Sequence, residues 1–144
     1  MVRLEHEIVI NRLPADVFAY VADPANLPEW QDSVHDVHRA DSGPLRVGSV
    51  WTEKRTVMRR GLEATVEVLE YEPDRLLTLR SMAGPVNMRV EHVFEQDGET
   101  TRLRLIGEGE LGGFAKLAGR MVRRQADETI KADLSSLKRR LEGG

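Results

Sequence analysis

Cysteine is absent from all 144 residues of the chain. Its absence excludes disulfides, thiolate metal sites and cysteine nucleophiles, and gives no support to an oxidising compartment. Also missing is any run of about 18 apolar residues, which a transmembrane helix would need. The first seven residues, Met1–Glu7, hold no apolar signal-peptide core. We therefore expect a cytoplasmic protein without a transmembrane segment.

Positive charge is not in excess, because the formal net charge is −3 and the isoelectric point is about 5.8. A domain that binds nucleic acid normally carries a basic face, so nucleic acid is not an expected partner. The four histidines show neither HxH nor HExxH spacing, and the GxSxG, Walker, GxGxxG and EF-hand patterns are missing. We expect no metal and no cofactor.

The residues that are present predict one folded domain over 1–144, since 40% are hydrophobic and 31% are charged. Apolar and polar residues alternate over Val2–Ile10, the pattern of a half-buried strand. Pro14 and Asp23-Pro24 carry the start signals of two short helices. Six extended stretches follow, at 33–39, 49–59, 62–71, 76–82, 86–95 and 100–111. Short turns between them, such as Arg60-Gly61, predict antiparallel neighbours.

Near the C-terminus the hydrophobic period changes to that of a helix. Apolar residues from Phe114 to Leu141 share one face and charged residues the other, which predicts a long helix over 113–141. The apolar stripe is interrupted over Gln125–Glu128. This interruption marks either a cavity or a slow drift of the stripe. A meander of strands buries such a helix by curling around it.

Several short motifs occur in a fixed order along nearly the whole chain. They are Pro14-Ala15-Asp16-Val17-Phe18, Asp23-Pro24 through Pro28-Glu29-Trp30, Val47-Gly48, Tyr71-Glu72-Pro73, Asp97-Gly98-Glu99-Thr100 and the closing Leu134, Leu137 and Leu141. Together they resemble the SRPBCC superfamily, in particular its polyketide cyclase/dehydrase and lipid-transport branch. The resemblance implies an α+β helix-grip fold: a seven-stranded curved antiparallel sheet wrapped around a long C-terminal helix, with two short helices between strands 1 and 2. The resemblance implies a fold that encloses a cavity, and it does not identify the ligand.

Two histidines fall on the apolar faces of their strands. His92 shares a strand face with Met88 and Phe94, and His6 shares one with Leu4. A buried imidazole stays neutral with a lowered pKa, and it serves either a ligand hydroxyl or an acid–base step. Each histidine is therefore a candidate catalytic residue, with a purely structural core histidine as the alternative.

Trp51, Glu53 and Arg55 share one face of the strand 49–59. We favour the phase that turns Trp51 into the cavity, because the resembled family often has an aromatic residue there. Glu53 and Arg55 then also point inward as a mutually neutralising pair and become candidate catalytic residues. The opposite phase, with both charges in water, stays open.

The expected ligand-binding residues are mostly large and apolar. They are Trp30, Trp51, Met88, His92, Phe94, Phe114, Leu117 and Met121. Gly107 and Gly109 have no side chains on the last strand, and we expect them to leave room beside the helix.

Three functions are compatible with such a container. The leading hypothesis is binding or transport of a hydrophobic small molecule, such as a polyketide, a lipid or an isoprenoid. The second is a polyketide cyclase or dehydratase, and the third is a co-chaperone-like interaction module. A cavity that contains His92 or the Glu53–Arg55 pair favours the enzyme, a purely apolar cavity favours the carrier, and a solid core favours the interaction module. The ligand and the oligomeric state stay open.

Overall fold

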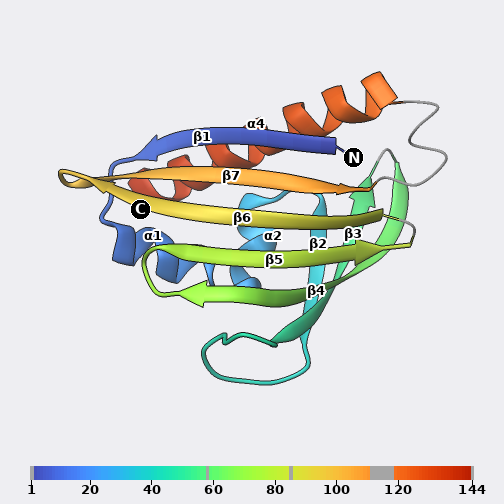
Figure 1. The fold of residues 1–144 in the computed structure, drawn as a ribbon, viewed down its shortest axis with the longest axis horizontal. Coiled ribbons are helices and arrows are strands. Elements are labelled where there is room, and N and C mark those ends of the chain that lie inside the picture. The colour runs from blue at the N-terminus through green and yellow to red at the C-terminus, as the bar shows by residue number, and fades with distance from the viewer. Residues whose placement is uncertain (1, 58, 85, 111–118, 144) are drawn as a thin grey trace.

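The computed structural model describes residues 2–57, 59–84, 86–110 and 119–143. Seven strands form one antiparallel sheet in the spatial order β1-β7-β6-β5-β4-β3-β2. Their bounds are β1 Val2–Ile10, β2 Val34–Arg39, β3 Val50–Val57, β4 Arg60–Glu72, β5 Leu76–Ala83, β6 Val86–Asp97 and β7 Thr100–Glu110. The helices lie together behind the sheet, on its concave side (Figure 1).

Two short helices and a 3₁₀ turn connect β1 to β2. Helix α1 (Pro14–Val21) has proline at its first position, where a missing N–H costs nothing. The 3₁₀ turn η1 (Pro24–Asn26) is capped by Asp23, whose side chain accepts a hydrogen bond from the Ala25 N–H, and α2 (Leu27–Trp30) follows it. The expected helix-grip arrangement, with its seven strands and its two short helices, is thereby confirmed.

The turn between β3 and β4 lies earlier than the Arg60-Gly61 dipeptide predicts. The strand ladder pairs Val57 with Arg60, so both residues of the expected turn belong to β4. The positive φ of 67° is found at Arg59 instead. A two-residue hairpin loop needs a residue in the left-handed backbone conformation. In this register that residue is Arg59 and not Gly61.

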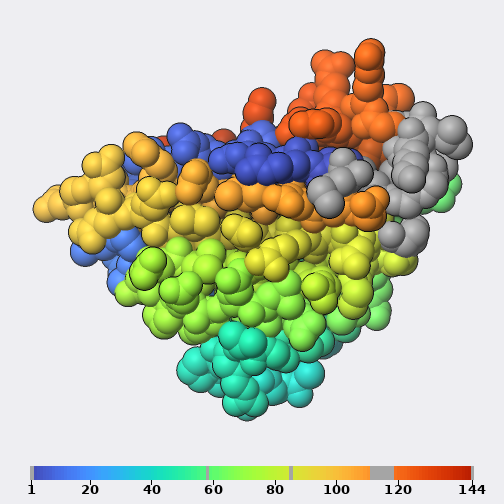
Figure 2. Space-filling model, viewed as in Figure 1, coloured from blue at the N-terminus to red at the C-terminus, as the bar shows by residue number. Residues whose placement is uncertain are grey.

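The long helix α4 (Gly119–Gly143) is held to the sheet chiefly by its C-terminal half. Leu134 and Leu137 belong to the buried core. Two hydrogen bonds add to this anchor: Lys138 Nζ donates to the Val9 carbonyl at 2.7 Å, and Arg12 Nε donates to the Leu141 carbonyl at 2.7 Å. The N-terminal end of α4 projects at the upper right of the molecule (Figure 2), and Arg123 Nη2 donates to the Arg3 carbonyl of β1 at 3.2 Å. The expected start of this helix, at 113–118, lies outside the described residues.

The described part of the chain contains no helix that is both long enough and apolar enough to cross a membrane.

The two glycines of β7 have different reasons to be glycine. A Cβ at Gly109 would lie 2.1 Å from the Asn87 carbonyl oxygen and 2.6 Å from Met88 Sδ, whereas a Cβ at Gly107 would meet only Met88 Cε, at 3.6 Å. Gly109 is thus required by the close approach of the β6 backbone, and Gly107 is not.

We expect Gly109→Ala to lower the free energy of unfolding by about 2 kcal/mol or more, because the backbone must move to admit the methyl group. Gly107→Ala is the matched control and should stay within about 0.5 kcal/mol of the wild type. Urea unfolding of the three proteins measures both values. Equal stability of the two variants would show that the strands separate freely at Gly109.

Candidate functional site

A cavity of about 440 Å³ lies between the concave face of the sheet and the N-terminal half of α4. Its walls are mainly apolar, and small residues on both sides leave the space open: Ala64, Ser81, Ala83 and Gly107 on the sheet, Ala126 and Thr129 on α4. The interruption of the apolar stripe over Gln125–Glu128 therefore coincides with the roof of a cavity.

A chain of hydrogen bonds runs along β3 on the cavity side. Trp51 Nε1 donates to Glu53 Oε1 at 2.8 Å, and Arg55 Nε donates to Glu53 Oε2 at 2.6 Å. Trp51 and Glu53 are each only 2% exposed, and all three side chains line the cavity. The phase of β3 is thus the one with Trp51 inside. The buried carboxylate is compensated by a cation and by an indole N–H.

The guanidinium of Arg55 is held from a second direction. Its Nη2 donates to Gln31 Oε1 at 2.8 Å and its Nη1 donates to Ser33 Oγ at 3.2 Å. Both partners lie in the connection between α2 and β2 and also line the cavity. Each Nη carries a further N–H beyond these bonds. Arg55 is a positioned donor whose remaining N–H groups are available to a ligand.

His92 lies in the cavity wall with its tautomer determined by its surroundings. Its Nδ1 is 3.0 Å from the Leu77 carbonyl oxygen, and because a carbonyl only accepts, Nδ1 carries the proton. Burial lowers the pKa of His92 to about 4, which the hydrogen bond to Leu77 only partly opposes. At neutral pH the ring is uncharged, and Nε2 offers a lone pair to a ligand.

Asp133 is a site residue that the sequence analysis missed. It lines the cavity from α4 and no described residue donates a hydrogen bond to it. Burial raises its pKa to about 7, with the nearby Arg55 cation lowering it and the Asp32 carboxylate raising it further. The signal was present in the sequence, because Asp133 falls between Ile130 and Leu137 on the apolar stripe of the helix.

The other expected ligand-binding residues divide into three groups. Trp30 and Met88 line the cavity, as Trp51 and His92 do. Phe94 and Met121 do not: Phe94 packs edge-on against Phe18 at 5.1 Å, in the part of the core covered by α1, and Met121 is 70% exposed. Phe114 and Leu117 lie outside the described residues. We therefore correct the expectation for Phe94 and Met121 alone.

His6 is on the concave face of β1 but outside the cavity. Its Nε2 lies 2.8 Å from Asp127 Oδ1 on α4, so the side chain joins the edge strand to the helix. The strand phase was predicted correctly. Because β1 is an edge strand that lies against α4, the side chain of His6 contacts the helix and does not line the cavity. Of the two alternatives for His6, a catalytic residue and a structural histidine, this contact favours the structural one. Within the described ranges, no cluster of histidine, aspartate and glutamate could hold a metal ion.

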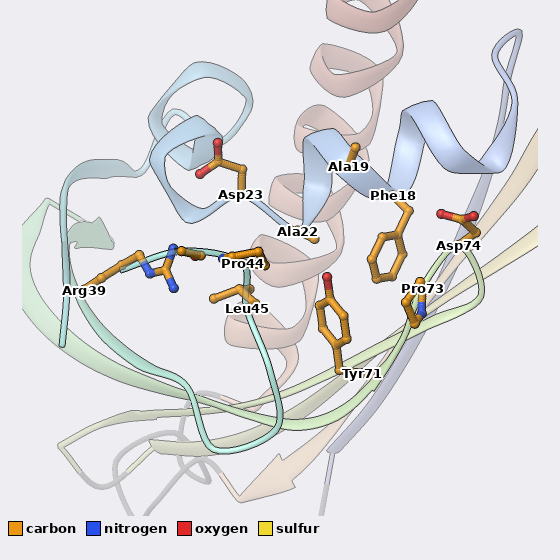
Figure 3. A pocket seen from close by; sticks show the side chains of 11 residues that line it. Phe18, Ala19, Ala22, Asp23, Arg39, Pro44, Leu45, Tyr71, Pro73 and Asp74 are labelled. Carbon is orange, nitrogen blue, oxygen red and sulfur yellow. The ribbon is translucent and has the colours of Figure 1, made fainter. Parts of the chain in front are cut away.

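A second hollow of about 410 Å³ lies outside the core, between α1, the β2–β3 connection and the β4–β5 turn. Phe18, Tyr71 and Leu45 form its floor, and Asp23 and Asp74 lie at its margins (Figure 3). Asp23 and Asp74 are exposed to solvent. The side chains of Arg55, His92 and Asp133 line the cavity under α4, which is therefore the candidate site.

The sequence matches one protein-family model from residue 1 to residue 142, and the description of that family is polyketide cyclase / dehydrase and lipid transport. The chain belongs to this family. Among proteins of curated function, none matches the sequence significantly.

Solved structures share the helix-grip fold of this family member. The protein TTHA0849 from Thermus thermophilus has a TM-score of 0.85 at 20% identity, with 99% of this chain and 98% of that chain covered. The Zhui aromatase/cyclase from Streptomyces sp. R1128 has a TM-score of 0.81 at 19% identity, with 98% and 93% covered. The di-domain ARO/CYC BexL of the BE-7585A biosynthetic pathway has a TM-score of 0.78 at 20% identity, with 99% of this chain and 47% of BexL covered. At these identities the likeness concerns the fold.

The buried neutral state of His92 makes a prediction about pH. Its pKa is about 4 in the folded protein and about 6.5 in an unfolded chain. As the pH falls from about 6.5 to about 4, the unfolded state takes up a proton that the folded state excludes, so stability is lost, by up to about 3 kcal/mol.

We therefore expect the free energy of unfolding to fall by about 3 kcal/mol more in the wild type than in His92→Gln between pH 7 and pH 4. Urea unfolding at both pH values measures this difference. Asp133 titrates in the opposite sense and is common to both proteins, so the difference isolates His92. An exposed-histidine variant, His35→Gln, should follow the wild type. Parallel pH curves for wild type and His92→Gln would contradict a neutral buried imidazole.

Proposed function

We propose that the protein binds an apolar small molecule that carries carbonyl and hydroxyl groups, and that it catalyses cyclisation or dehydration of this molecule in the cavity under α4. The observation that supports this proposal is that one cavity contains Arg55, His92 and Asp133 within otherwise mainly apolar walls. An apolar pocket with a few convergent polar groups and shifted pKa values is the usual form of a small-molecule site.

Arg55 is suited to bind the ligand's carbonyl oxygen. Its guanidinium is oriented by three hydrogen bonds, to Glu53, Gln31 and Ser33, before any ligand arrives. A donor fixed in this way stabilises the negative charge that develops on the oxygen when an enolate forms, and it does so without reorganisation.

Asp133 is suited to transfer a proton in both directions. With a pKa of about 7, its carboxyl group is found in both protonation states near neutral pH. His92 complements it, because the unprotonated Nε2 accepts a hydrogen bond from a ligand hydroxyl or enol and so orients the leaving group.

These roles give a balanced dehydration. The Asp133 carboxylate removes a proton from the carbon next to the carbonyl, and the electron pair moves onto the oxygen held by Arg55. The enolate then reforms the carbonyl and expels the hydroxyl on the neighbouring carbon, which takes the proton from Asp133 and leaves as water. A carbon–carbon double bond forms, no atom is oxidised or reduced, and Asp133 returns to its starting state. In ring closure the same enolate carbon attacks a second carbonyl, the electron pair of that carbonyl moves onto its oxygen, and the resulting alkoxide takes the proton from Asp133 to become a hydroxyl.

Two of the structural neighbours support this reading, since both are named as aromatase/cyclase proteins. A carrier without turnover is the second candidate, and the mainly apolar cavity walls favour it. The co-chaperone-like reading is disfavoured, because it predicted a solid core in place of a cavity.

Asp133→Asn separates the enzyme from the carrier. The amide occupies the same space but cannot take up the proton, so we expect turnover of a linear poly-β-carbonyl thioester to fall by about 10²- to 10⁴-fold, followed by mass spectrometry of the dehydrated or cyclised product. Binding of the thioester, measured by quenching of tryptophan fluorescence, should change little.

Asp127→Asn is the matched control, because it makes the same change on the same helix outside the cavity. It should retain full turnover. Tight binding of the thioester by the wild type without any dehydrated or cyclised product would contradict the enzyme and leave the carrier.

A further inference from the structure

We propose that Glu53 is a specificity-determining residue that makes the cavity select uncharged, carbonyl-bearing ligands and reject anionic ones such as fatty acids. The inference rests on the proposed function, because it names the class of molecule that the same site accepts. Its basis is the position of the Glu53 carboxylate directly behind the cation that an anionic head group would seek.

Both oxygens of Glu53 are already engaged inside the protein. One accepts from Trp51 Nε1 at 2.8 Å and the other from Arg55 Nε at 2.6 Å, and the residue is 2% exposed. The carboxylate is therefore not a free acid or base for the ligand. Its effect on a ligand is electrostatic, since it places a fixed negative charge next to Arg55.

Among the described residues, the ionisable groups of the cavity wall include no unpaired cation. Arg55 is compensated by Glu53, and His92 is neutral at physiological pH because its pKa is about 4. Asp133 adds either no charge or a further negative one, and Asp32 lies close enough to act on it electrostatically. The described part of the site is thus neutral at most, and an anionic ligand would bring a charge without a counter-ion into a largely apolar space.

An uncharged carbonyl avoids this cost. It needs only a hydrogen-bond donor, and Arg55 keeps N–H groups beyond those given to Glu53, Gln31 and Ser33. Ketones, esters and thioesters therefore match the site, and free carboxylates do not.

Two fluorescent probes with the same aromatic rings test the selection. Anilinonaphthalene sulfonate is anionic, and N-phenylnaphthylamine is its uncharged counterpart without the sulfonate. We expect wild type to bind the uncharged probe more tightly. In Glu53→Gln the compensating charge is lost while the side-chain shape is kept, so the affinity for the sulfonate should rise about tenfold or more, and the affinity for the uncharged probe should stay the same.

Three further variants control the experiment. Glu63→Gln makes the same substitution on the exposed face of β4 and should change neither affinity. The double variant Glu53→Gln/Arg55→Gln carries no charge at this position, should restore the wild-type ratio of the two affinities, and keeps the test open if Glu53→Gln alone does not fold. Ala126→Phe fills the cavity from α4 and should abolish binding of both probes, which places them there.

Equal sulfonate affinity in wild type and Glu53→Gln would overturn the role of Glu53 while leaving the binding function intact. A wild type that binds neither probe, or whose binding survives Ala126→Phe, would instead overturn the proposed function together with this inference.

Discussion

Leu134 and Leu137 fix α4 in the concave face of the sheet, where they keep 3% and 0% of their surfaces exposed. Burying two leucine side chains stabilises the fold by several kcal/mol, about 1.5–3 kcal/mol each. Hydrogen bonds from Lys138 and Arg12 close the same end of the helix. No comparable apolar anchor exists between 119 and 128 among the described residues, where the side chains are exposed or half-buried. The cavity exists because the helix is packed at one end and only spans the sheet at the other.

Polar groups inside this space are not explained by stability. A buried ion pair such as Glu53–Arg55 loses hydration that its attraction only partly replaces, so apolar residues of the same size would often serve a core equally well. Asp133 also weighs against folding, because burial raises its pKa to about 7 and no described residue donates a hydrogen bond to it. These polar groups reduce the stability of the fold, and they lie together in one cavity. This combination is expected of a site that acts on a ligand.

The sequence predicted most of the fold because its signals are local. Alternation along strands, proline and aspartate at helix starts, and the helical period of the C-terminus each depend on neighbours within a few residues. The two-residue period also placed His92, Met88 and Phe94 on the same face. It could not say where along that face the cavity ends, and Phe94 lies beyond this end, under Phe18 of α1. Such a limit depends on tertiary packing.

Asp133 shows a different limit. A carboxylate in an apolar stripe is visible in the sequence, but its meaning depends on which partners surround it, and these come from β3 and from the connection after α2. The same applies to Gln31 and Ser33, two ordinary polar residues that became part of the site only through the reach of Arg55 across to them.

That reach has a consequence for how such a protein can change. Arg55 takes its position from the sheet through Glu53 and from a surface connection through Gln31 and Ser33. The connection precedes β2, and the backbone of Ser33 bonds to the sheet, where its carbonyl accepts a hydrogen bond from the Thr56 N–H. Exchanging the side chains of Gln31 and Ser33 alters the direction of the guanidinium and leaves this backbone bond in place. A new ligand geometry is therefore accessible through substitutions in a loop, while the sheet and the C-terminal half of α4 keep the fold unchanged.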